Sequence, residues 1–157
     1  MAISTANVQI VRAGTPELGL VREALSEIVL RTSSYHGVLQ DENISSFLAS
    51  PSNYFLLALH GTRPVGALYG YLLYHPHRPD PQLFLYGIDV DENFRNRGIG
   101  TSLVRQFVQE ARKAGASEVW VITNESNQAA MKMYLRAGLE RASKDDVVLV
   151  IPTETEG

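Results

Sequence analysis

Residues 82–123 constrain the fold most strongly, because they place a strand, a helix and a second strand in direct succession. The first segment, QLFLYGIDV at 82–90, is apolar at odd and even positions, which predicts a strand buried on both faces near the centre of its sheet. Apolar residues then recur at helical spacing from Leu103 to Ala111, and Gly115 predicts the end of that helix. EVWVIT at 118–123 predicts a second buried strand. Because a helical crossover favours parallel pairing, we expect a mixed sheet.

The remaining segments complete a mixed α/β (α+β) pattern around that unit. Thr15 and Pro16 have the residue types preferred at the N-cap and the first turn of a helix. The dipeptide Gly61-Thr62 predicts a tight turn between two strands. The expected strands are 8–11, 54–60, 64–74 and 146–151, and the expected helices are 15–29, 41–50 and 127–138.

Length and composition indicate one globular unit. The chain has 157 residues, which suits a single domain, 1–157, with a sizeable core. Its net charge of −3 provides no basic field to attract nucleic acid or an anionic membrane. No apolar run has the length of a membrane span, and the first residues lack the pattern of a signal peptide. The absence of cysteine excludes thiolate chemistry and fits a reducing compartment, so we expect a cytoplasmic protein.

A glycine-rich turn, FRNRGIGT at 94–101, joins the expected strand at 82–90 to the long helix. The unpaired amides at a helix N-terminus attract anions, and glycines let the chain approach a phosphate closely. Arg95 and Arg97 are placed to add charged hydrogen bonds. The turn is therefore predicted to hold a phosphate or pyrophosphate, unless its glycines serve only the packing of the strand against the helix.

The spacing within the turn separates three kinds of phosphate-binding sequence. A P-loop requires a lysine after its last glycine, and none follows Gly100. A dinucleotide fingerprint requires a third glycine at the position where Leu103 stands. The pattern R-x-x-G-x-G remains, and Arg95, Gly98 and Gly100 satisfy it.

The stretch IDVDENFRNRGIGTSLV, at 88–104, resembles the acetyl-CoA-binding motif of the GNAT acetyltransferases. A second stretch, NQAAMKMYLRAGL at 127–139, is similar to a later helix of that family, with Leu139 in place of the usual phenylalanine. The resemblance covers about residues 8–151. It implies the GNAT-type acyl-CoA N-acyltransferase fold, in which a central mixed sheet is splayed at the cofactor site and flanked by about four helices.

The resemblance also implies which residues contact acetyl-CoA, the expected co-substrate. Ile88 and Val90 would contact the pantetheine arm through their backbone. Asn127 would hydrogen-bond that arm, cap the helix that it begins, or do both. The amides that would surround the pyrophosphate belong to Arg95, Asn96, Arg97, Gly98, Ile99, Gly100 and Thr101.

Catalysis in the family is a direct attack of an amine on the thioester, so no acyl-enzyme is needed. By similarity Tyr134 is the general acid for the CoA sulfur, and the alternative is a core aromatic residue of its helix. Asp89 is the carboxylate closest to the expected thioester and is our candidate general base. The alternatives are that Asp89 pairs with a basic neighbour such as Arg95 or Arg97, that Glu125 is the base, or that the amine is deprotonated through water.

The sequence leaves the acceptor amine open. Residues 54–90 resemble the aminoglycoside 3-N-acetyltransferase branch of the family in layout, which would make the protein an antibiotic-resistance enzyme. However, Gly87, Asn127 and Gln128 stand where that branch tends to have acidic residues, and a polycation requires several carboxylates. A small-molecule amine is the favoured partner, and a peptide or protein amine and a non-catalytic acyl-CoA-binding module remain alternatives. Dimerisation is common in the family, so a homodimer is allowed.

No metal site is expected. His75 and His77 are two residues apart in the proline-rich loop 75–81, and no further ligands stand beside them in the sequence. We expect these histidines to be exposed to solvent or to line the acceptor cleft.

Overall fold

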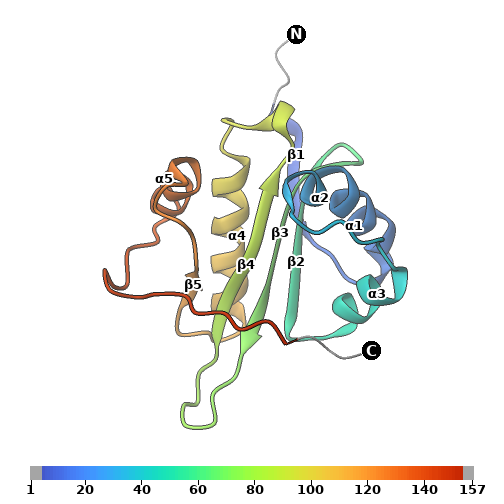
Figure 1. Cartoon of the computed structure of the whole chain (residues 1–157). Coiled ribbons are helices and arrows are strands. Elements are labelled where there is room, and N and C mark those ends of the chain that lie inside the picture. The colour runs from blue at the N-terminus through green and yellow to red at the C-terminus, as the bar shows by residue number, and fades with distance from the viewer. Residues whose placement is uncertain (1–4, 154–157) are drawn as a thin grey trace.

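The computed structural model describes residues 5–153 and contains a mixed sheet of five strands in chain order (Figure 1). Antiparallel pairing joins β1 to β2, β2 to β3 and β3 to β4, whereas β5 runs parallel to β4. This arrangement confirms the predicted mixed sheet and its parallel crossover. The strands are β1 Val8–Arg12, β2 Asn53–His60, β3 Arg63–Leu73, β4 Gln82–Val90 and β5 Val119–Val121.

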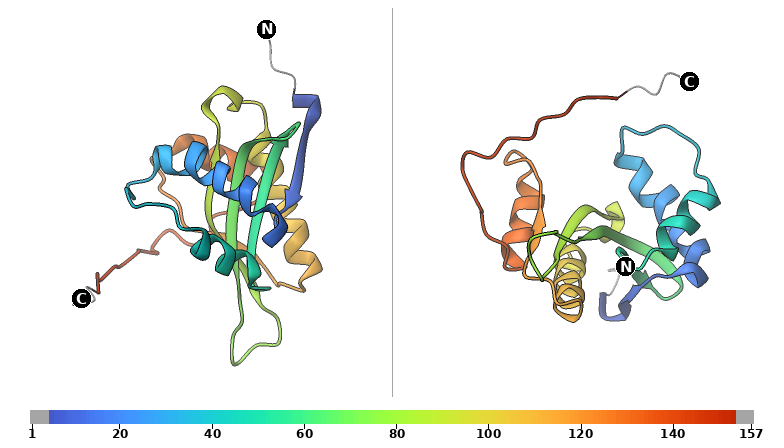
Figure 2. Two further views of the ribbon diagram at one scale, coloured as in Figure 1. Left: turned by 90° about the vertical axis from the view of Figure 1, so that its right-hand side faces the viewer. Right: turned by 90° about the horizontal axis from the view of Figure 1, so that it is seen from below.

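Helices cover both faces of the sheet (Figure 2). One face carries α1 (Leu18–Ala24), the π-helix η3 (Leu25–Val29) and α2 (Leu30–Thr32) in direct succession, together with α3 (Asp41–Ala49). The other face carries α4 (Ile99–Lys113), and α5 (Gln128–Arg136) packs beside α4. Within residues 5–153, no helix has the length and hydropathy needed to cross a membrane. Short 3-10 helices are η1 Thr5–Asn7, η2 Thr15–Glu17 and η4 Glu92–Phe94.

The first helical segment begins differently from the prediction. Thr15 is the first residue of η2, and the N-cap position is Gly14. The Gly14 amide donates to the Glu17 carboxylate at 2.7 Å, so Glu17 supplies the side-chain contact at this helix start. Pro16 lies in the first turn, as predicted.

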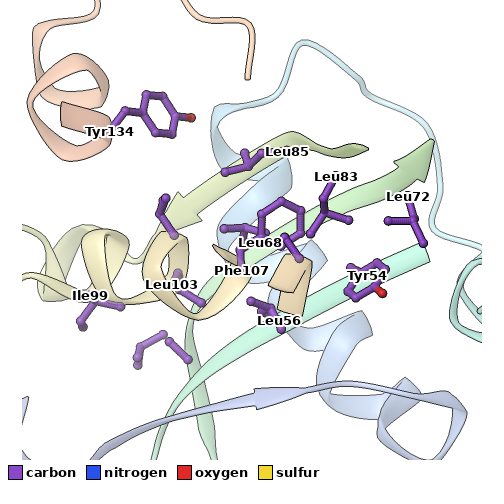
Figure 3. Packing of buried hydrophobic residues seen from close by; sticks show 14 of the residues in the cluster. Tyr54, Leu56, Leu68, Leu72, Leu83, Leu85, Ile99, Leu103, Phe107 and Tyr134 are labelled. Atoms are coloured by element: carbon purple, nitrogen blue, oxygen red, sulfur yellow. The ribbon is translucent and has the colours of Figure 1, made fainter. Parts of the chain in front are cut away.

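Each face of the sheet has its own apolar core, which explains why β2 is apolar at nearly every position. Leu56 packs beneath α4 against Phe107, as Figure 3 shows for the core on that side. Phe55 and Leu57 belong to the second core, beneath α1 and α3. Because β2 alternates between two buried faces, its sequence shows a continuous apolar run and not an apolar–polar alternation.

A bulge in β4 changes which residues face α4. Tyr86 is the extra residue, because its two neighbours in β4 pair with adjacent residues of β3. Before the bulge Leu85 packs in the α4 core, and after it Ile88 and Val90 do so. Asp89 consequently lies on the opposite face, the face that α1 and α2 cover.

The sheet is splayed between β4 and β5, as the resemblance implied. Within the described chain β5 pairs only with Leu83–Leu85, and the predicted strand 118–123 is shortened to Val119–Val121. Residues 87–90 keep their pairing with β3 but have no partner among the described strands on their other side (Figure 1). Tyr86 is 61% exposed, so the prediction that this strand is buried on both faces is wrong for its second half.

The segment 146–151 does not form the predicted last strand. Its apolar residues, 147–151, are 62–88% exposed. Figures 1 and 2 show the segment crossing the open side of the sheet from α5 toward the α1–α3 layer, away from the strands. No described strand pairs with it, so its strand-forming residues have neither a hydrogen-bonded partner nor a packed face.

We predict that truncating a side chain in the packed strand β4 lowers the free energy of unfolding far more than truncating one in the exposed segment 146–151. Leu83 is 0% exposed, and Leu83→Ala is expected to lower the free energy of unfolding by about 2–5 kcal/mol, because it leaves a cavity. Leu149 is 88% exposed, and Leu149→Ala is expected to change that free energy by no more than about 0.5 kcal/mol. Urea denaturation of both variants measures the two values. A loss for Leu149→Ala that approaches the loss for Leu83→Ala would show that segment 146–151 is a packed strand.

Candidate active site

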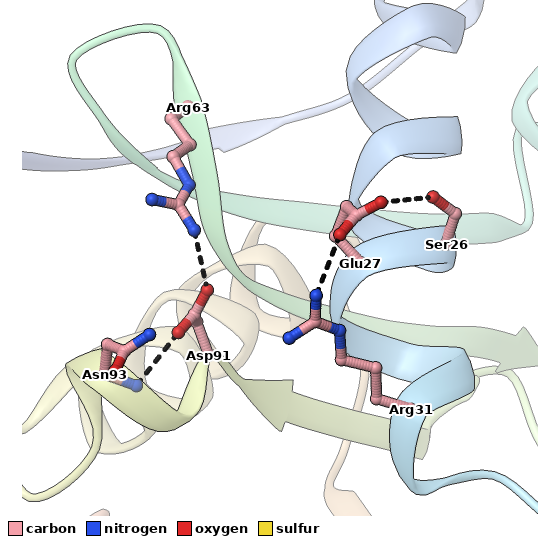
Figure 4. Close-up of polar contacts among 6 residues, drawn as sticks. All are labelled: Ser26, Glu27, Arg31, Arg63, Asp91 and Asn93. Carbon is pink, nitrogen blue, oxygen red and sulfur yellow. Dashed lines mark hydrogen bonds and ion pairs between the residues drawn. The ribbon is translucent and has the colours of Figure 1, made fainter.

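The turn that follows β4 is anchored by a buried carboxylate. Asp91 is 8% exposed, accepts a hydrogen bond from the Asn93 amide at 2.9 Å and pairs with Arg63 at 3.1 Å (Figure 4). Phe94, 3% exposed, inserts into the α4 core immediately afterwards. These contacts fix the path of the chain before the glycine turn begins. Asp91 was not among the predicted site residues, although a carboxylate that precedes a short helical turn is a recognisable capping signal.

Left-handed backbone then reverses the chain into α4. Asn96 has φ 60°, and Gly98, the N-cap of α4, has φ 81°. The Ser102 amide is bonded to the Gly98 carbonyl, so the amides of the preceding turn, from Ile99 to Thr101, stand at the positive end of a 15-residue helix. This arrangement suits an anion, and the phosphate site stays a prediction.

Gly100 has a packing role that the sequence did not indicate. A Cβ atom at this position would clash with Met133 Sδ on α5. The side chain of Ile99 is also committed to packing, since it is 4% exposed in the α4 core. At these two positions only the backbone amides remain as candidate phosphate ligands. Close packing therefore explains the glycine at position 100, and phosphate binding by the backbone amides stays a prediction.

Arg95 and Arg97 lie on either side of the left-handed residue. Arg95 Nε donates to the Val90 carbonyl at 3.1 Å. This bond ties the turn to the end of β4 and occupies one of the backbone groups that the resemblance assigned to pantetheine. The guanidinium of Arg97 lies 5.8 Å from the centroid of the Phe94 ring, over its face.

Tyr134 of α5 reaches the splayed edge of β4. Its side chain is 7% exposed, and Figure 3 shows its hydroxyl directed from α5 toward β4 near Leu85. Tyr134 belongs to the α4 core, so the alternative of a core aromatic residue holds for its ring. Burial, together with the nearby Asp89 carboxylate, raises the pKa of Tyr134 to about 12. The hydroxyl is therefore protonated at neutral pH and can donate a hydrogen bond into the gap.

Asp89 approaches the same gap from the other face of the sheet. Thr32 Oγ1, at the end of α2, donates to its carboxylate at 3.0 Å. Burial raises the pKa of Asp89, and the Thr32 hydrogen bond and the charge of Arg95 act in the opposite direction. Thr32 is 57 residues away in the sequence, so no local pattern could have identified it as the partner of Asp89.

The structure also places the other predicted side chains. Asn127 caps α5, because its side-chain oxygen accepts from the Ala130 amide at 3.2 Å. Glu125 is exposed and pairs with Arg141 at 2.6 Å, which leaves it less suited than Asp89 to act in the gap. His75 Nε2 lies 2.8 Å from Gln82 Oε1. Within residues 5–153, no cluster of histidine and carboxylate side chains could hold a metal ion.

Known proteins match the chain in both sequence and structure. The model of the acetyltransferase (GNAT) family matches residues 22–139. N-acetyltransferase 8F1 of Rattus norvegicus is 31% identical over 90 residues, which are 57% of this chain and 41% of that protein. The [ribosomal protein bS18]-alanine N-acetyltransferase of Escherichia coli (strain K12) is 30% identical over 59 residues, which are 38% of this chain and 40% of that protein. The matches thus span less than half the length of these curated relatives.

Solved structures share the fold at lower identity. An aminoglycoside acetyltransferase from an uncultured soil metagenomic sample superposes with a TM-score of 0.80 at 22% identity, over 96% of this chain and 99% of its own. Aminoglycoside 6'-N-acetyltransferase from Acinetobacter baumannii does so with a TM-score of 0.73 at 20% identity, over 94% and 99%. The family match extends over the splayed strand, the glycine turn and Tyr134, and the chain belongs to the GNAT acetyltransferase family.

Proposed function

We propose that the protein transfers an acetyl group from acetyl-CoA directly to a primary amine of a small molecule. The observation that carries this proposal is the position of the Tyr134 hydroxyl at the unpaired edge of β4, near the N-terminal end of α4. The gap offers the edge of β4 from Tyr86 to Asp89 to an amide-containing arm, whereas the Val90 carbonyl is bonded to Arg95, and the α4 amides suit a pyrophosphate. These features fit acetyl-CoA, which would supply the activated thioester.

Tyr134 acts on the sulfur side of the reaction. A phenol whose pKa is about 12 is a weaker acid than a thiol, whose ordinary pKa is about 8.5. The hydroxyl therefore stabilises negative charge as it develops on the departing sulfur, mainly by donating a hydrogen bond. When the carbon–sulfur bond has broken, the CoA thiolate takes up a proton, either from solvent or from Tyr134, which then regains its proton from solvent.

Asp89 acts on the amine side. The amine must lose a proton as its bond to the acetyl carbon forms, and a carboxylate with a raised pKa is a better base than an ordinary one. The hydrogen bond from Thr32 orients the carboxylate on the face opposite Ile88 and Val90. Asp89 thereby receives the proton, either directly or through one water molecule, while Tyr134 serves the leaving group.

A small molecule is favoured as the acceptor because a partly enclosed cavity adjoins the site. The cavity has a volume of about 210 Å³ and lies between α1, α3 and the sheet. A protein or peptide amine is the second candidate, since one relative is named as a ribosomal-protein alanine N-acetyltransferase. An acyl-CoA-binding module without activity would need neither an acceptor cavity nor a protonated tyrosine in the gap.

Tyr134→Phe tests the proposed function. The substitution removes the hydroxyl and keeps the ring in the core, so acetyl-CoA affinity is expected to be retained. Turnover of an acceptor amine is expected to fall by about 10²-fold, the smaller end of the effect of general acid catalysis. A thiol-release assay and calorimetric titration with acetyl-CoA measure the two quantities.

Tyr54→Phe is the matched control. Tyr54 is 4% exposed in the same core but packs near Arg12, away from the gap. This variant is expected to turn over at the wild-type rate. Equal rates in wild type, Tyr54→Phe and Tyr134→Phe would remove Tyr134 from the mechanism.

Asp89→Asn tests the electrostatics of the site through stability. Burial raises the pKa of Asp89 in the folded state above its value of about 3.9 in the unfolded chain. At a pH above the folded-state pKa, the ionised carboxylate therefore lowers the free energy of unfolding. At a pH below about 3.9 the group is protonated in both states and has no such effect. An asparagine side chain can still accept the Thr32 hydrogen bond but carries no charge. We expect the Asp89→Asn variant to be more stable than wild type at pH 7, with the difference shrinking toward pH 4. Urea denaturation at several pH values measures this, and a difference that grows at low pH would contradict the raised pKa.

A further inference from the structure

The cavity beside the site has a strongly aromatic lining. It lies between α1 with η3, the loop that precedes α3, α3 itself and the face of β2 and β3. Five of its described lining residues are aromatic, namely Tyr35, Phe47, Phe55, Tyr69 and Tyr71, and most of the others are aliphatic. A dry apolar cavity of about 150 Å³ accommodates benzene, so a cavity of about 210 Å³ has room for one aromatic ring.

The rings form walls with a defined geometry. Phe55 and Tyr69 are stacked, with centroids 6.1 Å apart and planes at 10°. Phe47 projects from α3 and meets the ring of Tyr69 edge-on at 6.1 Å and that of Tyr71 at 5.7 Å. Edge-to-face and offset contacts of this kind are the preferred arrangements between aromatic rings, and a ligand ring can join them.

The lining carries no formal charge. None of the described lining residues is Asp, Glu, Lys, Arg or His, and the only amide side chains are those of Gln40 and Asn43. The surrounding helices carry four carboxylates, of which Glu23 and Glu42 lie outside the described lining and the other two are each paired with an arginine. Asp41 pairs with Arg22, and Glu27 pairs with Arg31 at 3.0 Å (Figure 4). The described lining therefore offers no carboxylates that could compensate a polycation for the loss of its hydration.

Tyr69 connects the cavity to the reacting end of the site. It stands opposite Gly87 in the β3–β4 pairing, and a Cβ at Gly87 would lie 2.7 Å from its ring. The absent side chain lets Tyr69 lie across β4 toward Asp89, whose charge reaches the Tyr69 hydroxyl. A ligand whose body fills the cavity can therefore extend an amino group past Tyr69 toward Asp89 and the β4–β5 gap.

From this arrangement we infer that the acceptor is a primary monoamine with an aromatic body, such as an arylalkylamine, and not a polycationic aminoglycoside or polyamine. The inference rests on the proposed function and specifies the substrate class of the same site. The fold is shared with aminoglycoside acetyltransferases, but identities of 20–22% carry over the fold alone. One protonated amine is compatible with this lining, because aromatic faces attract a single cation.

Initial rates with 2-phenylethylamine, spermidine and sisomicin test the inference, with acetyl-CoA affinity measured by calorimetry in parallel. The kcat/KM for 2-phenylethylamine is expected to exceed the values for spermidine and sisomicin by about tenfold or more, because the site buries a ring but leaves additional charges unpaired. Phe47→Ala is expected to raise the KM for 2-phenylethylamine by about tenfold without changing acetyl-CoA affinity. Leu48→Ala, the neighbouring position of α3 outside the described lining, is expected to leave both values within about twofold of wild type.

Val38→Asp provides a second variant that does not depend on the core. Val38 is 82% exposed at the mouth of the cavity, so the substitution is expected to leave the fold intact. The new carboxylate is expected to shift the preference toward spermidine by about threefold or more.

Three outcomes would overturn the inference. The first is a preference of the wild type for sisomicin or spermidine. The second is an equal effect of Phe47→Ala and Leu48→Ala on the KM for 2-phenylethylamine. The third is an enzyme that binds acetyl-CoA but neither binds nor acetylates 2-phenylethylamine. A protein that does not bind acetyl-CoA would instead contradict the proposed function itself, so the two failures are distinguishable.

Discussion

The divergence of β5 from β4 beyond Leu85 is the constraint on which the site depends. An interior strand normally satisfies its backbone groups on both sides, but among the described strands residues 87–90 of β4 pair only with β3. The chain tolerates this open edge because the strand is held elsewhere. Its side chains at Ile88 and Val90 pack under α4, and its end is tied by Arg95 and Asp91. The result is a strand whose edge beyond Leu85 has no partner among the described strands, although its side chains and its end are held in place.

The bulge at Tyr86 gives this open edge two chemically different sides. Without the extra residue, Asp89 would point into the apolar core beneath α4. With it, Asp89 lies on the face of Thr32 and Tyr69, while Tyr134 reaches the gap from α5. A carboxylate and a protonated phenol thus approach one gap from opposite sides, which is the separation that a proton-accepting and a proton-donating role require. A single inserted residue therefore sets the electrostatic layout of the site.

Local signals in the sequence predicted the strand, glycine turn and helix from residue 82 to residue 115, and the capping role of Asn127. Features that depend on distant partners were missed. Segment 146–151 has strand-forming residues, but a strand also requires a neighbour, and none pairs with it in the described chain. The Thr32–Asp89 contact and the approach of Met133 to Gly100 join segments that no local pattern relates. The aromatic cavity was likewise invisible, because its rings come from a loop, α3, β2 and β3.

A crystal structure of the protein with acetyl-CoA would test the central claim most directly, namely that the gap between β4 and β5 is the acetyl-CoA site. The pantetheine arm is predicted to lie along residues 86–90, with the pyrophosphate at the amides of Ile99–Thr101 and the sulfur within hydrogen-bonding distance of the Tyr134 hydroxyl. The aromatic cavity beside α3 should then remain open for the amine. Acetyl-CoA bound in that cavity, or with its sulfur out of reach of Tyr134, would contradict both the assignment of the gap and the role of Tyr134.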